Sequence, residues 1–113
     1  MIEKEGLSYG SPCPWDSNVE TVGDSLLTPT KIYVQAFLPL LKKGLVKGVA
    51  HITGGGLLEN LPRTRPKGIG VEITNHPSLP SVFPWMKSVS GLDDHEMLRT
   101  FNCGITINPL NTY

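Results

Sequence analysis

The chain has 113 residues, which is enough for one modest globular domain and excludes two independent ones. Its 10 basic and 10 acidic side chains give a formal net charge of zero, so neither nucleic acid nor an anionic membrane is an expected partner. No apolar run approaches the roughly 20 residues of a membrane span, and no apolar signal-peptide region opens the chain. The two cysteines lie far apart. We therefore predict a cytoplasmic protein.

The first part of the chain predicts an irregular arm followed by a helix. Residues 1–22 are expected to form a lead-in arm, because Gly, Pro, Ser, Asn and Asp crowd together over residues 6–24 without a period. A helix is predicted over residues 29–43, where apolar side chains recur at helical spacing and Thr28 can serve as the N-cap. Pro39 inside it is expected to remove a backbone hydrogen bond.

The middle of the chain predicts a strand, a glycine turn and a short helix. Residues 45–53 form a short β-branched run bounded by glycine, which is typical of a mostly buried strand, and His51 lies near its end. Three consecutive glycines, Gly54 to Gly56, follow this strand. The sequence LLENL then predicts a short helix that stops at Pro62.

The last part of the chain predicts two strands and two helices. Residues 69–74 alternate as a second strand, residues 82–89 form a short helix, and another helix starts within residues 90–94. A last strand is predicted over residues 102–107, and Pro109 should end it. This order of elements predicts an α+β domain built of packed layers.

The triglycine segment is the best-shaped candidate site. Glycines between a strand and a helix allow backbone N–H groups to approach an anion, for which phosphate is the natural ligand. No Lys-Ser/Thr pair follows, and Glu59 stands where a dinucleotide fingerprint requires glycine, so neither named motif predicts ATP here. A tight turn needed only for close packing explains the glycines equally well, and both interpretations stay open at this level.

His51 and Thr53 are two residues apart in the predicted strand, so their side chains share one face near the glycines. There His51 is positioned to orient or protonate a reacting group. The alternative is a buried histidine bonded to a neighbouring carbonyl, which the residues by themselves favour.

Other polar residues have both a functional and a structural interpretation. Arg63 and Arg65 can form paired hydrogen bonds with a phosphate or carboxylate, yet arginines beside a proline turn are common on surfaces. Asn60 has the same ambiguity. Asp24 can hold a cation or a ribose hydroxyl, although an Asp at this position is more often a turn or cap residue.

No metal site is predicted, because the histidines and cysteines lack the spacing of metal ligands. Cys103 lies in an apolar run and is expected to pack rather than act as a nucleophile.

Three sequence blocks carry a resemblance to a known family. They are GDSLLTPTKIYV at 23–34, AHITGGGLLENLPR at 50–63 and MLRTFNCGI at 97–105. In order and spacing they resemble aminoimidazole ribonucleotide synthetase (AIR synthetase), also called phosphoribosylformylglycinamidine cyclo-ligase. The resemblance runs from about Gly23 through nearly the whole remaining chain, but it covers only part of the family's C-terminal domain.

The resemblance implies an activity in de novo purine biosynthesis. Enzymes of this family close formylglycinamidine ribonucleotide to aminoimidazole ribonucleotide: ATP phosphorylates the formyl amide oxygen, the amidine nitrogen attacks that carbon, and phosphate leaves. ATP and Mg²⁺ are bound mainly by the family's N-terminal domain, which this sequence lacks. The isolated chain is therefore expected to supply part of the substrate cleft and to be inactive alone.

The resemblance also implies a set of site residues. His51 becomes the catalytic candidate, as acid or orienter. The substrate-binding candidates are Thr53, Gly54, Gly55, Gly56, Asn60 and Arg63 from one block, and Asp24, Thr30, Lys31, Thr100 and Asn102 from the other two. No metal ligand is among them.

The implied fold is a mixed β-sheet with helices on its faces, a three-layer α/β/α arrangement over residues 23–113. The family continues beyond the Asn-Cys-Gly-Ile sequence with further elements, so we expect a domain truncated at its C-terminus. The implied partners are the substrate, the N-terminal AIR synthetase domain and a second copy in a homodimer. The alternative is a non-catalytic phosphate-binding or regulatory module that reuses this half-domain; other members of the wider superfamily lack the Arg-Thr-Phe-Asn-Cys-Gly block.

Overall fold

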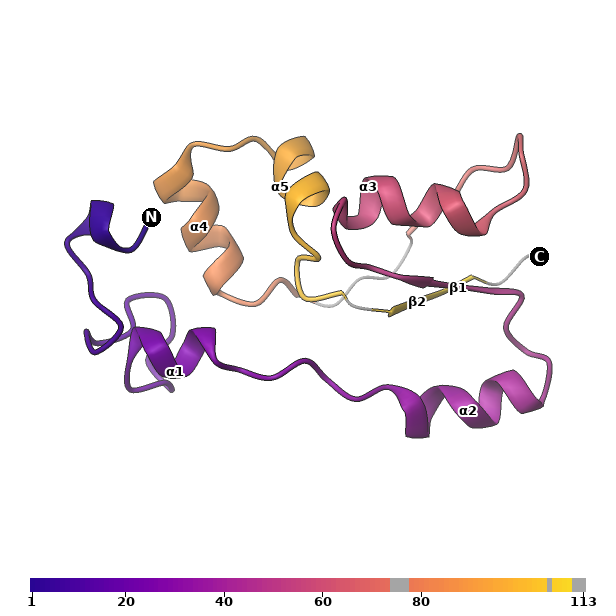
Figure 1. The fold of residues 1–113 in the computed structure, drawn as a ribbon, viewed down its shortest axis with the longest axis horizontal. Helices are drawn as coiled ribbons and strands as arrows, with labels where there is room; N and C mark the ends of the chain where they lie inside the picture. Colours follow the sequence, from indigo (N-terminus) through magenta and orange to yellow (C-terminus); the bar gives the residue numbers. More distant parts are fainter. Residues whose placement is uncertain (74–77, 106, 111–113) are drawn as a thin grey trace.

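Short helices make up most of the regular structure of the described residues (Figure 1). The computed structural model describes residues 1–73, 78–105 and 107–110. Its elements in chain order are η1 (Glu3–Glu5), α1 (Val22–Leu26), α2 (Val34–Lys42), β1 (Gly48–His51), α3 (Gly56–Asn60), η2 (Leu61–Thr64), α4 (Val82–Ser90), α5 (Asp94–Thr100) and β2 (Ile107–Leu110).

The two helices predicted in the last third of the chain are confirmed as α4 and α5. Gly91 adopts the left-handed conformation that ends α4, with a φ of 72°. Asp93 then caps α5, because its Oδ1 accepts a hydrogen bond from the Glu96 amide at 2.8 Å. Local chemistry is sufficient to define both boundaries.

The predicted start of the helix at residue 29 is wrong, because Thr28 is bonded back to the end of a preceding helix. That helix, α1, was not predicted; Thr21 caps it by accepting the Asp24 amide at 3.1 Å. The Thr28 amide donates to the Ser25 carbonyl at 3.3 Å, so Thr28 follows the end of α1 and does not cap a new helix. The second helix, α2, begins only at Val34 and contains Pro39.

The described residues contain one small sheet, in which β1 pairs antiparallel with β2. The strand predicted at 45–53 is confirmed in its centre but is shorter. Pro109 was expected to end the last strand, yet it lies inside β2 opposite Val49. Proline is tolerated there because in a two-stranded sheet each strand is an edge strand, with one side that has no ladder partner.

Two predicted strand segments have a different structure. Residues 69–73 form no strand; Val71 and Ile73 pack against the core without a ladder partner, and residue 74 lies outside the described residues. Residues 102–105 form a turn, in which the Ile105 amide donates to the Asn102 carbonyl at 2.8 Å. The last strand therefore starts at Ile107, and residue 106 is outside the described part.

The core lies between β1 and α3. Its buried cluster consists of Ala50, Ile52, Leu57 and Leu61, with Val71, Ile73, Leu98 and Ile105 packed against it. This small core holds together the strand that ends at His51 and the helix that follows the glycines.

The molecule is elongated, with extents of 48 × 30 × 21 Å. Its radius of gyration is 16.6 Å, whereas a compact domain of this length has about 13 Å. The residues that precede α1 pack at one end of the long axis, where the rings of Trp15 and Trp85 lie 4.3 Å apart between centroids. The sheet, α2 and α3 lie at the other end (Figure 1).

Candidate functional site

The three glycines that join β1 to α3 differ in whether the structure requires them. Gly56 has a φ of +57°, and a Cβ there would lie 2.0 Å from the carbonyl oxygen of Leu98, because α5 packs its backbone directly against the turn. Gly55 has a φ of +93°, and its Cβ would lie 2.5 Å from Oε2 of Glu59. Packing and backbone conformation therefore account for the second and third glycines.

Gly54 is different, because neither its conformation nor its surroundings require glycine. Its φ lies outside the left-handed region, and no atom stands within 4 Å of an added Cβ. The residue is exposed. The open side of the turn is therefore at Gly54, where an external group can approach the backbone.

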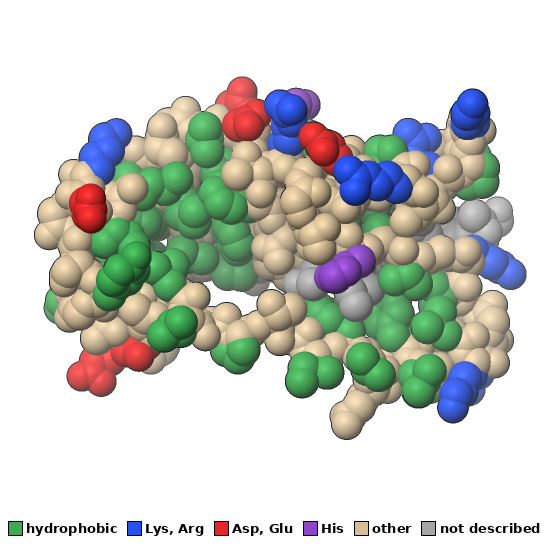
Figure 2. Space-filling model, in the orientation of Figure 1, with side chains coloured by type: hydrophobic (Ala, Val, Ile, Leu, Met, Phe, Trp, Pro, Cys, Tyr) green, Lys and Arg blue, Asp and Glu red, His purple; other side chains and the backbone are tan. Residues whose placement is uncertain are grey.

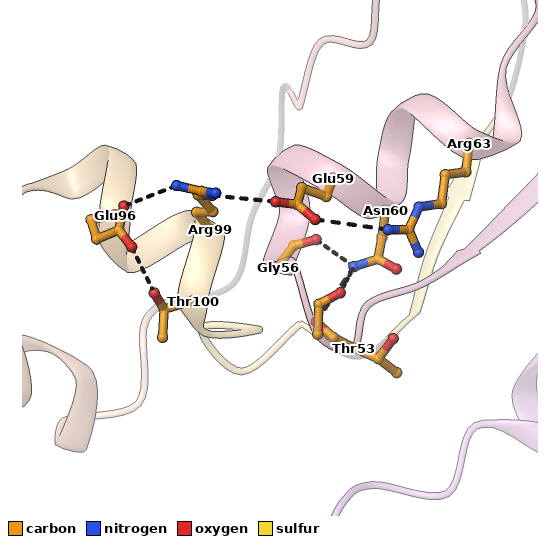
Figure 3. Close-up of polar contacts among 9 residues, drawn as sticks. Thr53, Gly56, Glu59, Asn60, Arg63, Glu96, Arg99 and Thr100 are labelled. Carbon is orange, nitrogen blue, oxygen red and sulfur yellow. Dashed lines mark hydrogen bonds and ion pairs between the residues drawn. The ribbon is translucent and has the colours of Figure 1, made fainter.

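Asn60 is buried beneath the turn, with 5% of its surface exposed (Figure 3). Its Nδ2 donates to the carbonyl oxygens of Gly56 at 2.7 Å, Gly54 at 3.1 Å and Thr53 at 3.4 Å. The structure thus places the amide group of this predicted substrate ligand inside the turn.

His51 and Thr53 follow the strand periodicity predicted for them. Ala50 and Ile52 are buried, whereas the two residues that alternate with them are exposed. The alternative of a buried His51 is therefore excluded, and its imidazole is accessible at the end of β1. The next two residues after Thr53, Gly54 and Gly55, carry no side chains that could cover this face.

A groove between α2 and β1 brings together three of the predicted site residues: Thr30, Lys31 and His51. The rest of its lining is largely apolar and comes mainly from residues 32–34 and α2. Hydrophobic side chains are visible over α2 along the lower edge of the molecule (Figure 2). His51 therefore lies where this groove and the glycine turn meet along β1.

Arg63 belongs to a network of exposed charges that links η2, α3 and α5 (Figure 3). Glu59 pairs with Arg63 at 3.8 Å and with Arg99 at 3.2 Å, and Arg99 also approaches Glu96 at 3.7 Å. Each of these side chains is at least 42% exposed, so the pairs contribute little to stability. Both Arg63 and Arg99 pair with Glu59, so their guanidinium groups lie beside α3.

Sequence reasoning missed Glu59 and Arg99 as members of this network. The spacing of Glu59 and Arg63 is i,i+4, which was a usable signal for their ion pair. Nothing local links Glu59 to Arg99, because only the packing of α5 on α3 brings them together.

Thr100 is the last residue of α5, and Asn102 comes shortly after it. Thr100 Oγ1 donates to Oε1 of Glu96 at 3.3 Å, and Asn102 Oδ1 accepts from the Gly104 amide at 3.2 Å. Both residues lie at the end of α5, whose Leu98 carbonyl contacts the turn. They are thus connected to the glycine turn through backbone packing.

Asp24 is not brought to the turn. It lies in α1, at the other end of the molecule from α3 (Figure 1). Its Oδ2 accepts a hydrogen bond from Thr21 Oγ1 at 2.6 Å, which gives it a local role at the start of α1. Arg65 is also occupied locally, because its guanidinium donates to the Ile69 carbonyl.

Cys103 is buried, as its apolar surroundings predicted. Burial raises the pKa of its thiol, because the thiolate is disfavoured away from water. The Cys103 Sγ donates to the Met97 carbonyl at 3.7 Å, so this side chain packs under α5 and takes no part in the site.

Within residues 1–73 and 78–105, no group of three His, Cys, Asp or Glu side chains is arranged to hold a metal ion. Among the described helices, none has the length and apolar content needed to cross a bilayer.

Comparison with known proteins gives consistent matches. The family model described as AIR synthase related protein, C-terminal domain, matches residues 1–107. Over 106 residues, or 93% of the chain, the sequence is 50% identical to the bovine trifunctional purine biosynthetic protein adenosine-3 and 48% identical to the human protein of that name. It is also 48% identical to the bifunctional purine biosynthetic protein ADE1 of Schizosaccharomyces pombe. The chain spans 10% of the first two relatives and 13% of the third.

Proposed function

We propose that this chain supplies part of the substrate cleft of a cyclo-ligase. The chain belongs to the AIR synthase related family, whose C-terminal domain model it matches. The reaction is the ATP-dependent closure of formylglycinamidine ribonucleotide to aminoimidazole ribonucleotide. Relatives named as purine biosynthetic proteins support this proposal.

The observation that carries the proposal is the unit formed by β1, the glycine turn and α3. Gly54 leaves the backbone open at a point where neither packing nor conformation demands a glycine. A phosphate oxygen can approach the amides of such a turn more closely than it could approach a residue with a side chain. We assign the substrate phosphate to this position, with Arg63 as a nearby cation.

His51 is the group we assign to proton transfer. Its imidazole is exposed at the end of β1, a few residues before Gly54 and on the same face as Thr53. A substrate held by its phosphate at the turn would extend along this face, toward the groove lined by Thr30 and Lys31. There His51 can donate or accept a proton at a ring nitrogen while Thr53 offers a hydroxyl to orient the substrate.

The described residues do not fit the Mg²⁺ of the implied reaction, since no acidic cluster is present and Glu59 is already paired with two arginines. Mg²⁺ and ATP both belong, in this proposal, to a separate N-terminal AIR synthetase domain.

The exposed apolar surface of α2 supports a larger assembly. None of its residues is buried, and Leu38 and Leu41 are 46% and 47% exposed. A two-stranded sheet is also marginal by itself. We propose that in a complete cytoplasmic enzyme these elements join a three-layer α/β/α domain on a mixed sheet, which adjoins the N-terminal domain in a homodimer.

The proposal is tested by complementation. The 113-residue chain is mixed with a separately expressed N-terminal AIR synthetase domain, formylglycinamidine ribonucleotide and Mg-ATP, and aminoimidazole ribonucleotide is detected by mass. We expect product in the mixture and none with either chain alone. A mixture in which the folded chain binds substrate but yields no product would instead favour a non-catalytic phosphate-binding module.

A further inference from the structure

Asn60 is the one buried polar side chain among the described residues, and its contacts all lie within the glycine turn. The carboxamide has two N–H donors at one end and a carbonyl oxygen at the other. Because backbone carbonyls only accept hydrogen bonds, the three carbonyls around this side chain identify Nδ2 as the end that faces them.

The direction of these carbonyls determines the direction of the neighbouring amides. In a trans peptide unit the N–H points opposite to the C=O, and no described peptide bond is cis. Since the carbonyls of Thr53 and Gly54 point toward Asn60, the amides of Gly54 and Gly55 point to the other side of the turn. Neither amide has a hydrogen-bond acceptor within the part of the chain that the structure describes.

From this geometry we infer that Asn60 is a positioning residue, which holds the Gly54 and Gly55 amides outward for the substrate phosphate and does not itself contact substrate. The inference rests on the proposed function. Glycines rotate more freely than other residues, so a turn of three in succession has many conformations to choose from. A buried side chain bonded to three of its carbonyls selects one of them before substrate arrives, which lowers the entropic cost of binding.

The inference is tested with the ¹⁵N-labelled 113-residue chain, titrated with formylglycinamidine ribonucleotide while the Gly54 and Gly55 amide signals are followed. Asn60→Leu removes the carboxamide at nearly constant size. Leu61→Ala is the matched control, because it creates a cavity at the neighbouring buried residue without touching a hydrogen bond of the turn. We expect Asn60→Leu to weaken binding by about tenfold, because the glycine backbone must then be ordered when substrate binds. Leu61→Ala should bind nearly as the parent chain once its folded fraction is accounted for.

Three results would overturn the inference. Equal affinity of Asn60→Leu and the parent chain would overturn it and leave the proposed function intact. Equal losses in Asn60→Leu and Leu61→Ala would reduce Asn60 to a structural role. No response of the parent chain to substrate would overturn the proposed function together with the inference.

A measurement on the parent chain tests whether Asn60 contacts substrate, even if Asn60→Leu does not fold. We expect the Asn60 side-chain protons to exchange slowly with solvent, and to keep their positions when substrate shifts the two glycine amides. A nuclear Overhauser contact between substrate and the Asn60 side chain would show direct binding and overturn the inference.

Discussion

The glycine turn and α2 differ in how much each contacts the rest of the chain. At the turn, Gly56 packs against the backbone of α5, and the Asn60 amide is surrounded by acceptors. In α2 no residue is buried, although apolar side chains recur along the helix. The turn is thus held by contacts within the chain, whereas α2 has the sequence of a packed helix without the packing. The comparison indicates that the turn to which we assign the substrate phosphate is already formed in this chain, whereas α2 lacks a packing partner.

The largest expected effect concerns His51, which lies where the two regions meet. In the enzyme reconstituted with an N-terminal domain, His51→Ala should lower the rate of ring closure by about a hundredfold or more, the typical contribution of a general acid or base. His95→Ala in α5 is the control, since His95 is exposed away from the groove lining and its loss should leave the rate near that of the parent. Steady-state rates measure both, and equal losses would contradict the assignment of His51.

The next prediction compares the buried core with α2. Ile52→Ala should lower the free energy of unfolding by about 2 to 5 kcal/mol, because it leaves a cavity under the turn. Leu38→Ala in α2 should change it by about 0.5 kcal/mol or less, since that side chain is 46% exposed. Urea denaturation followed by circular dichroism measures both values. A loss at Leu38 as large as at Ile52 would show that α2 is packed in solution.

A third prediction separates the glycines of the turn from one another. Gly56→Ala should cost about 1 to 3 kcal/mol of unfolding free energy, because the added methyl group overlaps the Leu98 carbonyl. Gly54→Ala should stay within about 1 kcal/mol of the parent chain, since its conformation and surroundings accept a side chain.

Gly54→Ala also tests the phosphate assignment. Gly54→Ala should keep the fold yet weaken substrate binding in the amide titration, because its methyl group occupies the open side of the turn. Unchanged binding by Gly54→Ala would place the phosphate elsewhere.

The smallest effect concerns Cys103, which packs beneath α5. Burial raises the pKa of this thiol, so at any given pH a smaller fraction of it is the reactive thiolate. Alkylation by iodoacetamide, followed by mass spectrometry, should therefore label the partly exposed Cys13 first. Cys103 should react faster as the pH rises or after unfolding in urea. Equal rates at the two cysteines in the folded chain would contradict the burial of Cys103 beneath α5.

Much of the local structure was determined by the sequence itself, because it depends on neighbouring residues. The caps of α5, the alternation that exposes His51 and Thr53, and the position of the glycine turn all follow from side chains within a few residues. The family membership also follows from the sequence, because three blocks with specific residues occur in a specific order.

Tertiary structure alone decided which glycine is open and which polar residue faces inward. The need for glycine at position 56 comes from Leu98, a residue of another helix, and the pairing of Glu59 with Arg99 has the same origin. Strand assignments failed at residues 69–73 for a related reason, because a strand exists only where a partner supplies its hydrogen bonds. Contacts between distant segments depend on packing, and no local pattern in the sequence contains them.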